Sequence, residues 1–137
     1  MLEDHKTNSL KDIILSVAKS ITHLPDKLFL KKVVRLFKSR EKLIFESGKI
    51  DWAMAELLAY GTLMSEGFDV RISGQDVERG TFSHRHAVLK SEDSEEEYLP
   101  LNNIKVKDKG IFRIYNSPLS EYAVLGFDYG YALASPR

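Results

Sequence analysis

The sequence contains no cysteine and no long apolar run, and each absence excludes classes of protein. Without cysteine there is no disulfide framework, no thiolate nucleophile and no cysteine-ligated zinc site. No apolar run approaches the roughly 20 residues that a helix needs to span a bilayer. The amino terminus, MLEDHKTNSLKD, has neither the basic start nor the apolar stretch of a secretory signal. We therefore expect a soluble, intracellular protein, cytoplasmic in a bacterium or in the mitochondrial matrix of a eukaryote.

The sequence also lacks an excess of charge of either sign. Its 20 Lys and Arg residues balance 20 Asp and Glu residues, so the formal net charge at pH 7 is zero. This balance argues against nucleic acid or an anionic membrane as the main partner, because both attract strongly basic surfaces. A chain of 137 residues suffices for one domain with a buried core, or for a piece of a larger protein.

Residues 1–48 have the pattern of a helical lead-in. A first helix, with Ser9 and Asp12 as its start signal and Pro25 as its end, is indicated by Leu10, Ile13, Ile14, Val17 and Ile21 at helical spacing. A second helix is predicted from Lys27 to Glu46, with an apolar stripe of Leu30, Val33, Val34, Phe37 and Ile44. Its other face carries Lys31, Lys32, Arg35, Lys38 and Lys42. A solvated face explains these charges better than a binding surface does.

Residues 49–137 alternate between helix and strand patterns. The predicted order is a helix over 50–67 capped by Asp51, a strand over 68–73 with Val70 and Ile72 on one face, two extended arms joined by the acidic run 91–97, and a strand over 111–117. We interpret the acidic run as a solvated hairpin loop and not as a metal site. This order favours an α/β domain with a parallel or mixed sheet and flanking helices.

A last helix is predicted from Ser117 as its cap and Pro118 as its first residue. Small residues recur along it every four positions, at Gly126, Gly130 and Ala134. The chain stops where an α/β unit would supply its next strand, so we expect a piece of a longer protein.

The densest polar stretch, SGQDVERGTFSHRHAVL over 73–89, follows a predicted strand, where open α/β sheets place ligand crevices. His84 and His86 would face the same side of a strand, but no third ligand stands at a recognised zinc spacing, so no metal site is predicted. The stretch is interpreted either as a hydrogen-bonded loop or as a holder of an anionic substrate, the latter through Gln75, Asp76, Arg79, His84, Arg85 and His86.

Glu121, in the first turn of the last helix, has two interpretations. An acidic residue there commonly offsets the positive end of the helix dipole, and the bare sequence favours this role. The alternative is a carboxylate held in place to share a proton with a ligand.

Three blocks of the sequence together resemble a known family. They are IDWAMAELLAYGTLMSEGFDVRISGQDVERGTFSHRHAVL, PLNN and YNSPLSEYAVLGFDYGYALASPR. In this order they are similar to the decarboxylating component of 2-oxoglutarate dehydrogenase, a thiamine diphosphate enzyme. The resemblance covers nearly all of residues 50–137 and implies the start of a transketolase-like pyrimidine-binding domain.

The family's pattern of a glutamate followed by two glycine–apolar pairs is matched by Glu121, Gly126, Phe127, Gly130 and Tyr131. The resemblance implies that Leu119 and Glu121 contact the cofactor and that Glu121 hydrogen-bonds a nitrogen of the aminopyrimidine ring. It implies decarboxylation of 2-oxoglutarate in the tricarboxylic acid cycle and transfer of the succinyl group to a lipoyl arm of the partner succinyltransferase. It also implies that the small residues pack across a homodimer interface.

The family holds the diphosphate and its magnesium ion with an earlier domain, so the isolated chain is expected to be inactive. The alternatives are a non-catalytic α/β interaction module or another 2-oxo acid decarboxylase of the same superfamily. The residues alone do not name the oxo acid.

Overall fold

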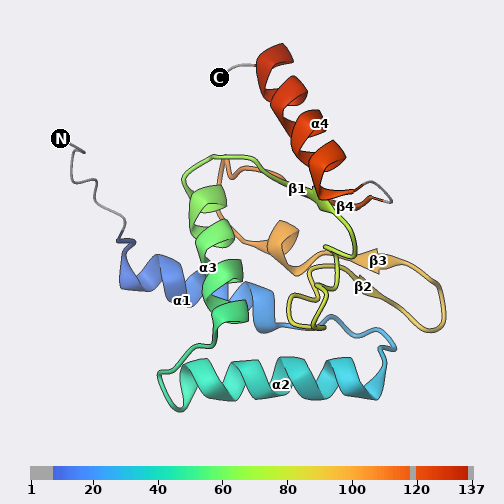
Figure 1. Ribbon diagram of the computed structural model, residues 1–137. Helices are drawn as coiled ribbons and strands as arrows, with labels where there is room; N and C mark the ends of the chain where they lie inside the picture. The colour runs from blue at the N-terminus through green and yellow to red at the C-terminus, as the bar shows by residue number, and fades with distance from the viewer. Residues whose placement is uncertain (1–7, 118–119, 136–137) are drawn as a thin grey trace.

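The structure, a computed structural model, describes residues 8–117 and 120–135 (Figure 1). Along the chain lie α1 (Lys11–Thr22), α2 (Lys31–Phe45), α3 (Trp52–Ser65), β1 (Val70–Gly74), β2 (Leu89–Lys90), β3 (Glu97–Tyr98), the short 3-10 helix η1 (Pro100–Asn103), β4 (Phe112–Asn116) and α4 (Glu121–Ala134). The predicted mixed α/β fold with a helical lead-in is confirmed. No helix in the described ranges has the length and apolarity to cross a lipid bilayer.

Strands β1 and β4 pair in parallel, as expected. Val70 lies opposite Phe112, and Gly74 lies opposite Asn116. On β4, Phe112 and Ile114 are buried, while Val70 and Ile72 of β1 are partly buried against the same core. Because side chains alternate along a strand, Arg71 projects from the opposite face of this two-stranded sheet.

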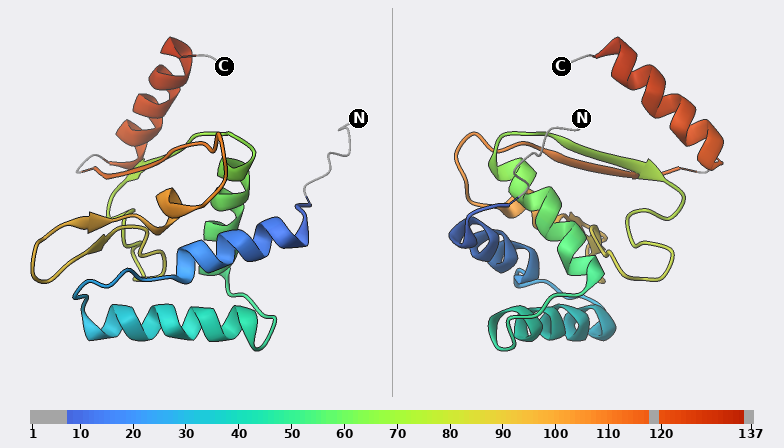
Figure 2. Two further views of the ribbon diagram at one scale, coloured as in Figure 1. Left: turned by 180° about the vertical axis from the view of Figure 1, so that it is seen from behind. Right: turned by 60° about the vertical axis from the view of Figure 1, so that its left-hand side comes forward.

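The sheet lies between helices. Figure 2 shows α4 above the β1–β4 pair, with α3 and α1 on the other side. The main core forms on the α3 side, and its completely buried members include Val17, Ala18, Met54 and Met64. Helix α1 therefore shares a core with the α/β segment, and a domain division near Gly48 stays a prediction.

The starts of α1 and α2 differ from the prediction. Helix α1 begins at Lys11 after Leu10, with no side-chain cap, so Ser9 does not cap it. Helix α2 begins at Lys31 and not at Lys27. The residues before α2 are held against the hairpin that follows β2, because the Leu28 carbonyl accepts hydrogen bonds from that hairpin.

Local signals located α3 and the β2–β3 hairpin well. The Asp51 carboxylate caps α3 by accepting a hydrogen bond of 2.8 Å from the Met54 N–H, as predicted. Strands β2 and β3 pair antiparallel around the acidic run, which confirms the predicted hairpin.

Candidate functional site

Helix α4 begins at Glu121, and the side-chain oxygen of Ser120 accepts a hydrogen bond from the Ala123 N–H. The prediction that Ser117 caps this helix is therefore wrong. The Ser117 N–H instead donates to the Gly74 carbonyl at 2.8 Å, which holds the chain in register with β1 just before the helix. Pro118 and Leu119, the expected first helical residue and an expected cofactor contact, lie outside the described residues.

Glu121 lies at a cleft between the start of α4 and the loop that follows β1. This cleft has a volume of about 360 Å³ and is lined by Ser73, Gly74, Gln75, Val77, Thr81, Glu121, Val124, Leu125 and Asp128. It brings Gln75 and Glu121 together, although they are far apart in the sequence. The Glu121 side chain is exposed and makes no hydrogen bond or ion pair with any residue that the structure describes. Its carboxylate is therefore available to a ligand.

The predicted histidines lie in the loop between β1 and β2, not on a strand. His86 has a positive φ of 46°, and the backbone N–H groups of Arg85 and His86 both donate to the Arg79 carbonyl. The expectation that the two imidazoles face one side of a strand is wrong. The described residues include no group of three or more His, Asp or Glu side chains placed to hold a metal ion.

Asp76 and His86 open onto a different cleft, of about 290 Å³, between α2, β2 and the loop. Lys32, Arg79 and Lys90 also line it. Burial lowers the pKa of His86, and the nearby Arg40 cation lowers it further, which favours the neutral imidazole. Of the predicted substrate-side residues, Gln75 thus lines one cleft and Asp76, Arg79 and His86 line the other, while His84 and Arg85 line neither.

Arg85 points inward and fixes the loop to α3. Its guanidinium donates to Glu56 Oε1 at 2.6 Å and to the Val77 carbonyl at 2.6 Å. Burial alone would raise the pKa of Glu56, but the hydrogen bonds from Arg85 and Tyr60 hold it below its ordinary value. Burial, with the adjoining Glu56, raises the pKa of Tyr60 to about 12. Arg85 therefore orders the loop that carries the histidines.

Arg40 of α2 is a residue that sequence reasoning missed. It is only 3% exposed, and its guanidinium donates to the backbone carbonyls of His84 and Arg85. Its spacing carried the signal, because Val33, Phe37, Arg40 and Ile44 are the buried residues of α2 and follow the helical period. A basic residue on the apolar stripe indicates a buried contact.

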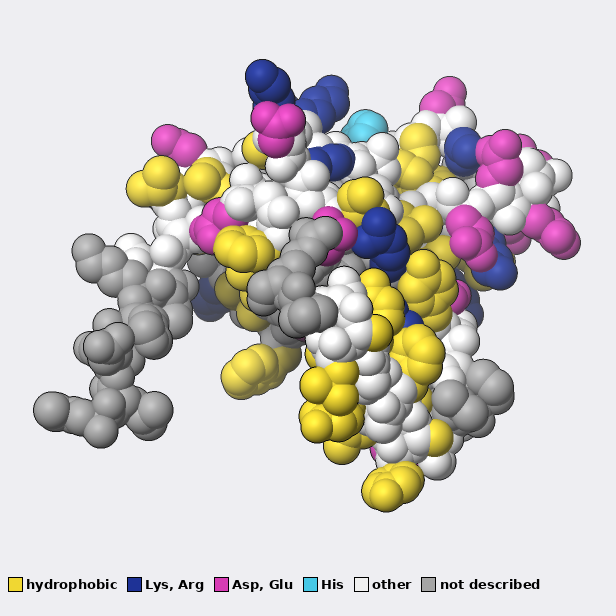
Figure 3. Space-filling view, turned by 90° about the horizontal axis from the view of Figure 1, so that it is seen from above, with side chains coloured by type: hydrophobic (Ala, Val, Ile, Leu, Met, Phe, Trp, Pro, Cys, Tyr) yellow, Lys and Arg dark blue, Asp and Glu magenta, His cyan; other side chains and the backbone are white. Residues whose placement is uncertain are grey.

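The small residues of α4 lie on an exposed helix. No residue of α4 is buried, and a Cβ added at Gly126 or Gly130 would meet no atom within 4 Å. Figure 3 shows hydrophobic side chains along this protruding helix. Packing of Gly126, Gly130 and Ala134 against a second surface stays a prediction.

Comparison with known proteins supports the resemblance found in the sequence. Residues 48–137, more than half of the chain, match the family described as transketolase, pyrimidine binding domain.

Several curated relatives are named 2-oxoglutarate dehydrogenase E1 component. The chain is 42% identical to that of Geobacillus kaustophilus over 137 residues, which cover 99% of this chain and 14% of the relative. It is 46% identical to that of Brucella anthropi over 122 residues (88% and 12%) and 50% identical to that of Rickettsia felis over 106 residues (77% and 11%). The chain thus spans about one eighth of the length of these relatives. It belongs to the family of transketolase-type pyrimidine-binding domains.

Proposed function

We propose that this chain forms part of the decarboxylating component of 2-oxoglutarate dehydrogenase and supplies its proton-exchanging glutamate. One observation carries the proposal. Glu121 stands at the first turn of α4 with its carboxylate on a cleft, and it makes no ion pair within the described part of the chain. The names of the relatives supply the substrate, 2-oxoglutarate, and the enzyme complex.

The residues of the cleft fit the pyrimidine end of thiamine diphosphate. Val77, Val124 and Leu125 offer apolar contacts to a flat ring, while Glu121 and Gln75 offer hydrogen-bonding groups at its edge. The described residues provide no carboxylate cluster for the magnesium ion that would accompany the diphosphate. We therefore assign only the pyrimidine end of the cofactor to this chain.

Glu121 would hold a proton at a ring nitrogen of the bound pyrimidine. Glu121 is the first residue of α4, and Ser120 caps the helix directly before it. Thiamine diphosphate, when bound, supplies the carbon centre that makes decarboxylation of a 2-oxo acid possible. The chain's own contribution is orientation and one proton. In the complete enzyme the succinyl group would pass to a lipoyl arm of the succinyltransferase.

A segment exchange tests this function. The chain replaces the matching segment of the Geobacillus kaustophilus relative, which it matches over 99% of its own length. We expect this chimera to decarboxylate 2-oxoglutarate with thiamine diphosphate and magnesium, and to prefer it to pyruvate. The unaltered relative is the control. A chimera that folds and assembles like the control but lacks activity would overturn the proposal and favour a non-catalytic module.

We further propose that the loop carrying Gln75, Asp76, His84, Arg85 and His86 borders the substrate. In the chimera, His86→Ala should raise the Michaelis constant for 2-oxoglutarate or lower turnover about 10-fold or more, because a positioned polar contact is lost. His23→Ala, on an exposed histidine at the end of α1, is the matched control. Wild-type kinetics in His86→Ala would overturn this proposal for His86.

Substitution of an exposed glycine of α4 should have different effects in the 137-residue chain and in the chimera. In the 137-residue chain, Gly130→Leu should be neutral or stabilising, because the space beside Gly130 is open and leucine favours helix by roughly 1 kcal/mol. In the chimera the same change should weaken a dimer, since overpacking costs about 1 to 3 kcal/mol. Ala132→Leu, on the opposite side of α4, is the control. Sedimentation velocity measures the dimer, and an unchanged dimer in Gly130→Leu would show that the ridge faces solvent.

A further inference from the structure

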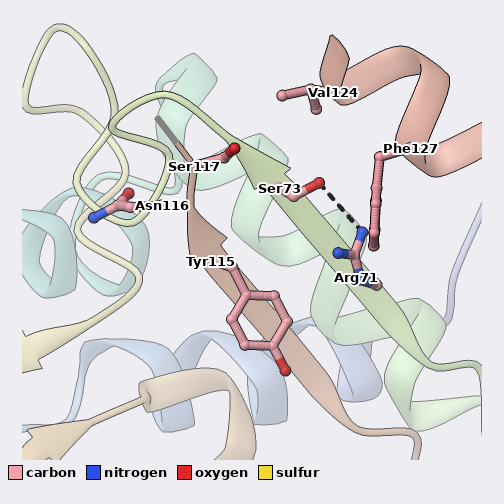
Figure 4. Close-up of a pocket in the computed structure, with 7 residues that line it drawn as sticks. All are labelled: Arg71, Ser73, Tyr115, Asn116, Ser117, Val124 and Phe127. Carbon is pink, nitrogen blue, oxygen red and sulfur yellow. Dashed lines mark hydrogen bonds between the residues drawn. The ribbon is translucent and has the colours of Figure 1, made fainter. Parts of the chain in front are cut away.

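Arg71 lies at the junction of β1, β4 and α4. Figure 4 shows Arg71 and Ser73 on β1, with Tyr115 on β4 and Phe127 on α4 around the same hollow. The Arg71 guanidinium donates to Asp128 Oδ1 at 2.6 Å and to Ser73 Oγ at 3.2 Å. Its central carbon lies 5.6, 4.8 and 5.1 Å from the ring centres of Tyr115, Phe127 and Tyr131. One cation thus touches groups from all three elements.

Helix α4 depends on this cluster for its placement. None of its residues is buried, so it has little apolar packing against the rest of the described chain. Asp128 and Glu121 are seven residues apart, or about two helical turns, and therefore share a face. Both line the cleft of about 360 Å³. A change in the contact between Asp128 and Arg71 would therefore turn or shift the Glu121 carboxylate within that cleft.

We propose that Arg71 is a positioning residue that sets the place of Glu121 by clamping Asp128 and the aromatic face of α4 to the sheet. The inference rests on the proposed function of Glu121. It adds a residue on β1 that is not among those lining the cleft at Glu121.

The chemistry of the cluster calls for arginine. The Arg71 and Asp128 side chains are 22% and 45% exposed, so the ion pair by itself is partly screened by solvent. The planar guanidinium also stacks on aromatic rings and keeps its in-plane N–H groups for Asp128 and Ser73. A lysine would keep the charge but lose this combination. Arg71→Lys should therefore restore only a small part of what Arg71→Met removes.

The first test uses the 137-residue chain and amide hydrogen exchange. Arg71→Met should speed exchange of the α4 amides about 10-fold or more, because the helix loses its anchor. Arg113→Met is the matched control. Arg113 is the register partner of Arg71 on β4 and pairs with Asp69 at 2.9 Å, an ion pair that does not involve α4. Equal exchange in wild type and Arg71→Met, or equal acceleration in both variants, would overturn the clamp.

The second test measures coupling to Glu121 in the chimera. Arg71→Met should lower turnover about 10- to 100-fold with little change in the Michaelis constant for 2-oxoglutarate, since small misplacements of a reacting group have effects of this size. Added to Glu121→Gln, it should cost less than about 3-fold more, because both changes remove one function. Full additivity, or wild-type turnover in Arg71→Met, would refute the positioning role. An inactive parent chimera would count against the proposed function, and the exchange experiment would still decide the clamp.

Discussion

Glu121→Gln should lower turnover of the chimera about 100- to 10,000-fold at saturating thiamine diphosphate. The amide keeps the size of the side chain and much of its hydrogen bonding but does not act as an acid or a base. Glu121 lies at the cleft that also holds Gln75, and no described side chain neutralises its carboxylate. Steady-state turnover and the rate of hydrogen–deuterium exchange at the cofactor's thiazolium carbon should fall together.

The competing interpretation of Glu121, a partner for the helix dipole, predicts a different result. It expects a loss of roughly 0.3 to 1 kcal/mol of stability and nearly normal turnover. Ser120→Ala separates the two, because it removes the N-cap, typically worth about 1 kcal/mol, and leaves the carboxylate in place. Turnover that falls equally in Ser120→Ala and Glu121→Gln would assign the effect to the helix start. Near-normal turnover in Glu121→Gln would return Glu121 to the dipole role.

Elements whose signals are local could be predicted from the sequence. The Asp51 cap acts on an N–H three residues away, and α3 begins where the pattern places it. The alternation in β4 likewise separates buried Phe112 and Ile114 from the half-exposed residue between them. The parallel pairing followed from the order of helices and strands, because a chain that crosses over by a long connection enters its second strand in the same direction.

Features that depend on distant contacts were not predictable in this way. The start of α2 is delayed because the segment before it packs on the hairpin, where buried Phe29 contacts Tyr98. The sequence left two interpretations of the loop after β1, a hydrogen-bonded loop or a holder of an anionic substrate. In the structure Arg85 reaches α3, and Arg40 holds the loop from α2. Gln75 therefore lines a different cleft from Asp76 and His86. The helical spacing marks Arg40 as buried, but no spacing names the partners of Arg40 and Arg85.

The clamp at Arg71 shows the same limit. A lone arginine between Val70 and Ile72 reads as the solvent-facing residue of an edge strand. Its role depends on the register of β1 and β4 and on the position of α4. Together these place Tyr115, Phe127 and Asp128 around Arg71. The site therefore depends on the β1–β4 pair, which carries the Gln75 loop on one strand and leads into α4 from the other.

That strand pair depends in turn on a close backbone approach at Gly110, so Gly110→Ala should destabilise the chain by about 3 kcal/mol. A Cβ at Gly110 would lie 1.8 Å from the Phe68 carbonyl oxygen and 2.3 Å from its carbon. These are backbone atoms, so no change of rotamer relieves the clash. The Gly110 N–H also donates to the Met64 carbonyl at 2.8 Å, which ties the entry of β4 to the end of α3.

Alanine at Gly126 should instead stabilise the chain. Open space surrounds that position, and alanine in place of a helical glycine stabilises by roughly 0.5 to 1 kcal/mol. Urea unfolding of the 137-residue chain, followed by far-ultraviolet circular dichroism, measures both variants against the parent. A Gly110→Ala chain within about 0.5 kcal/mol of the parent would contradict the close approach. The β1–β4 register that orients Glu121 and Gln75 would then need another origin.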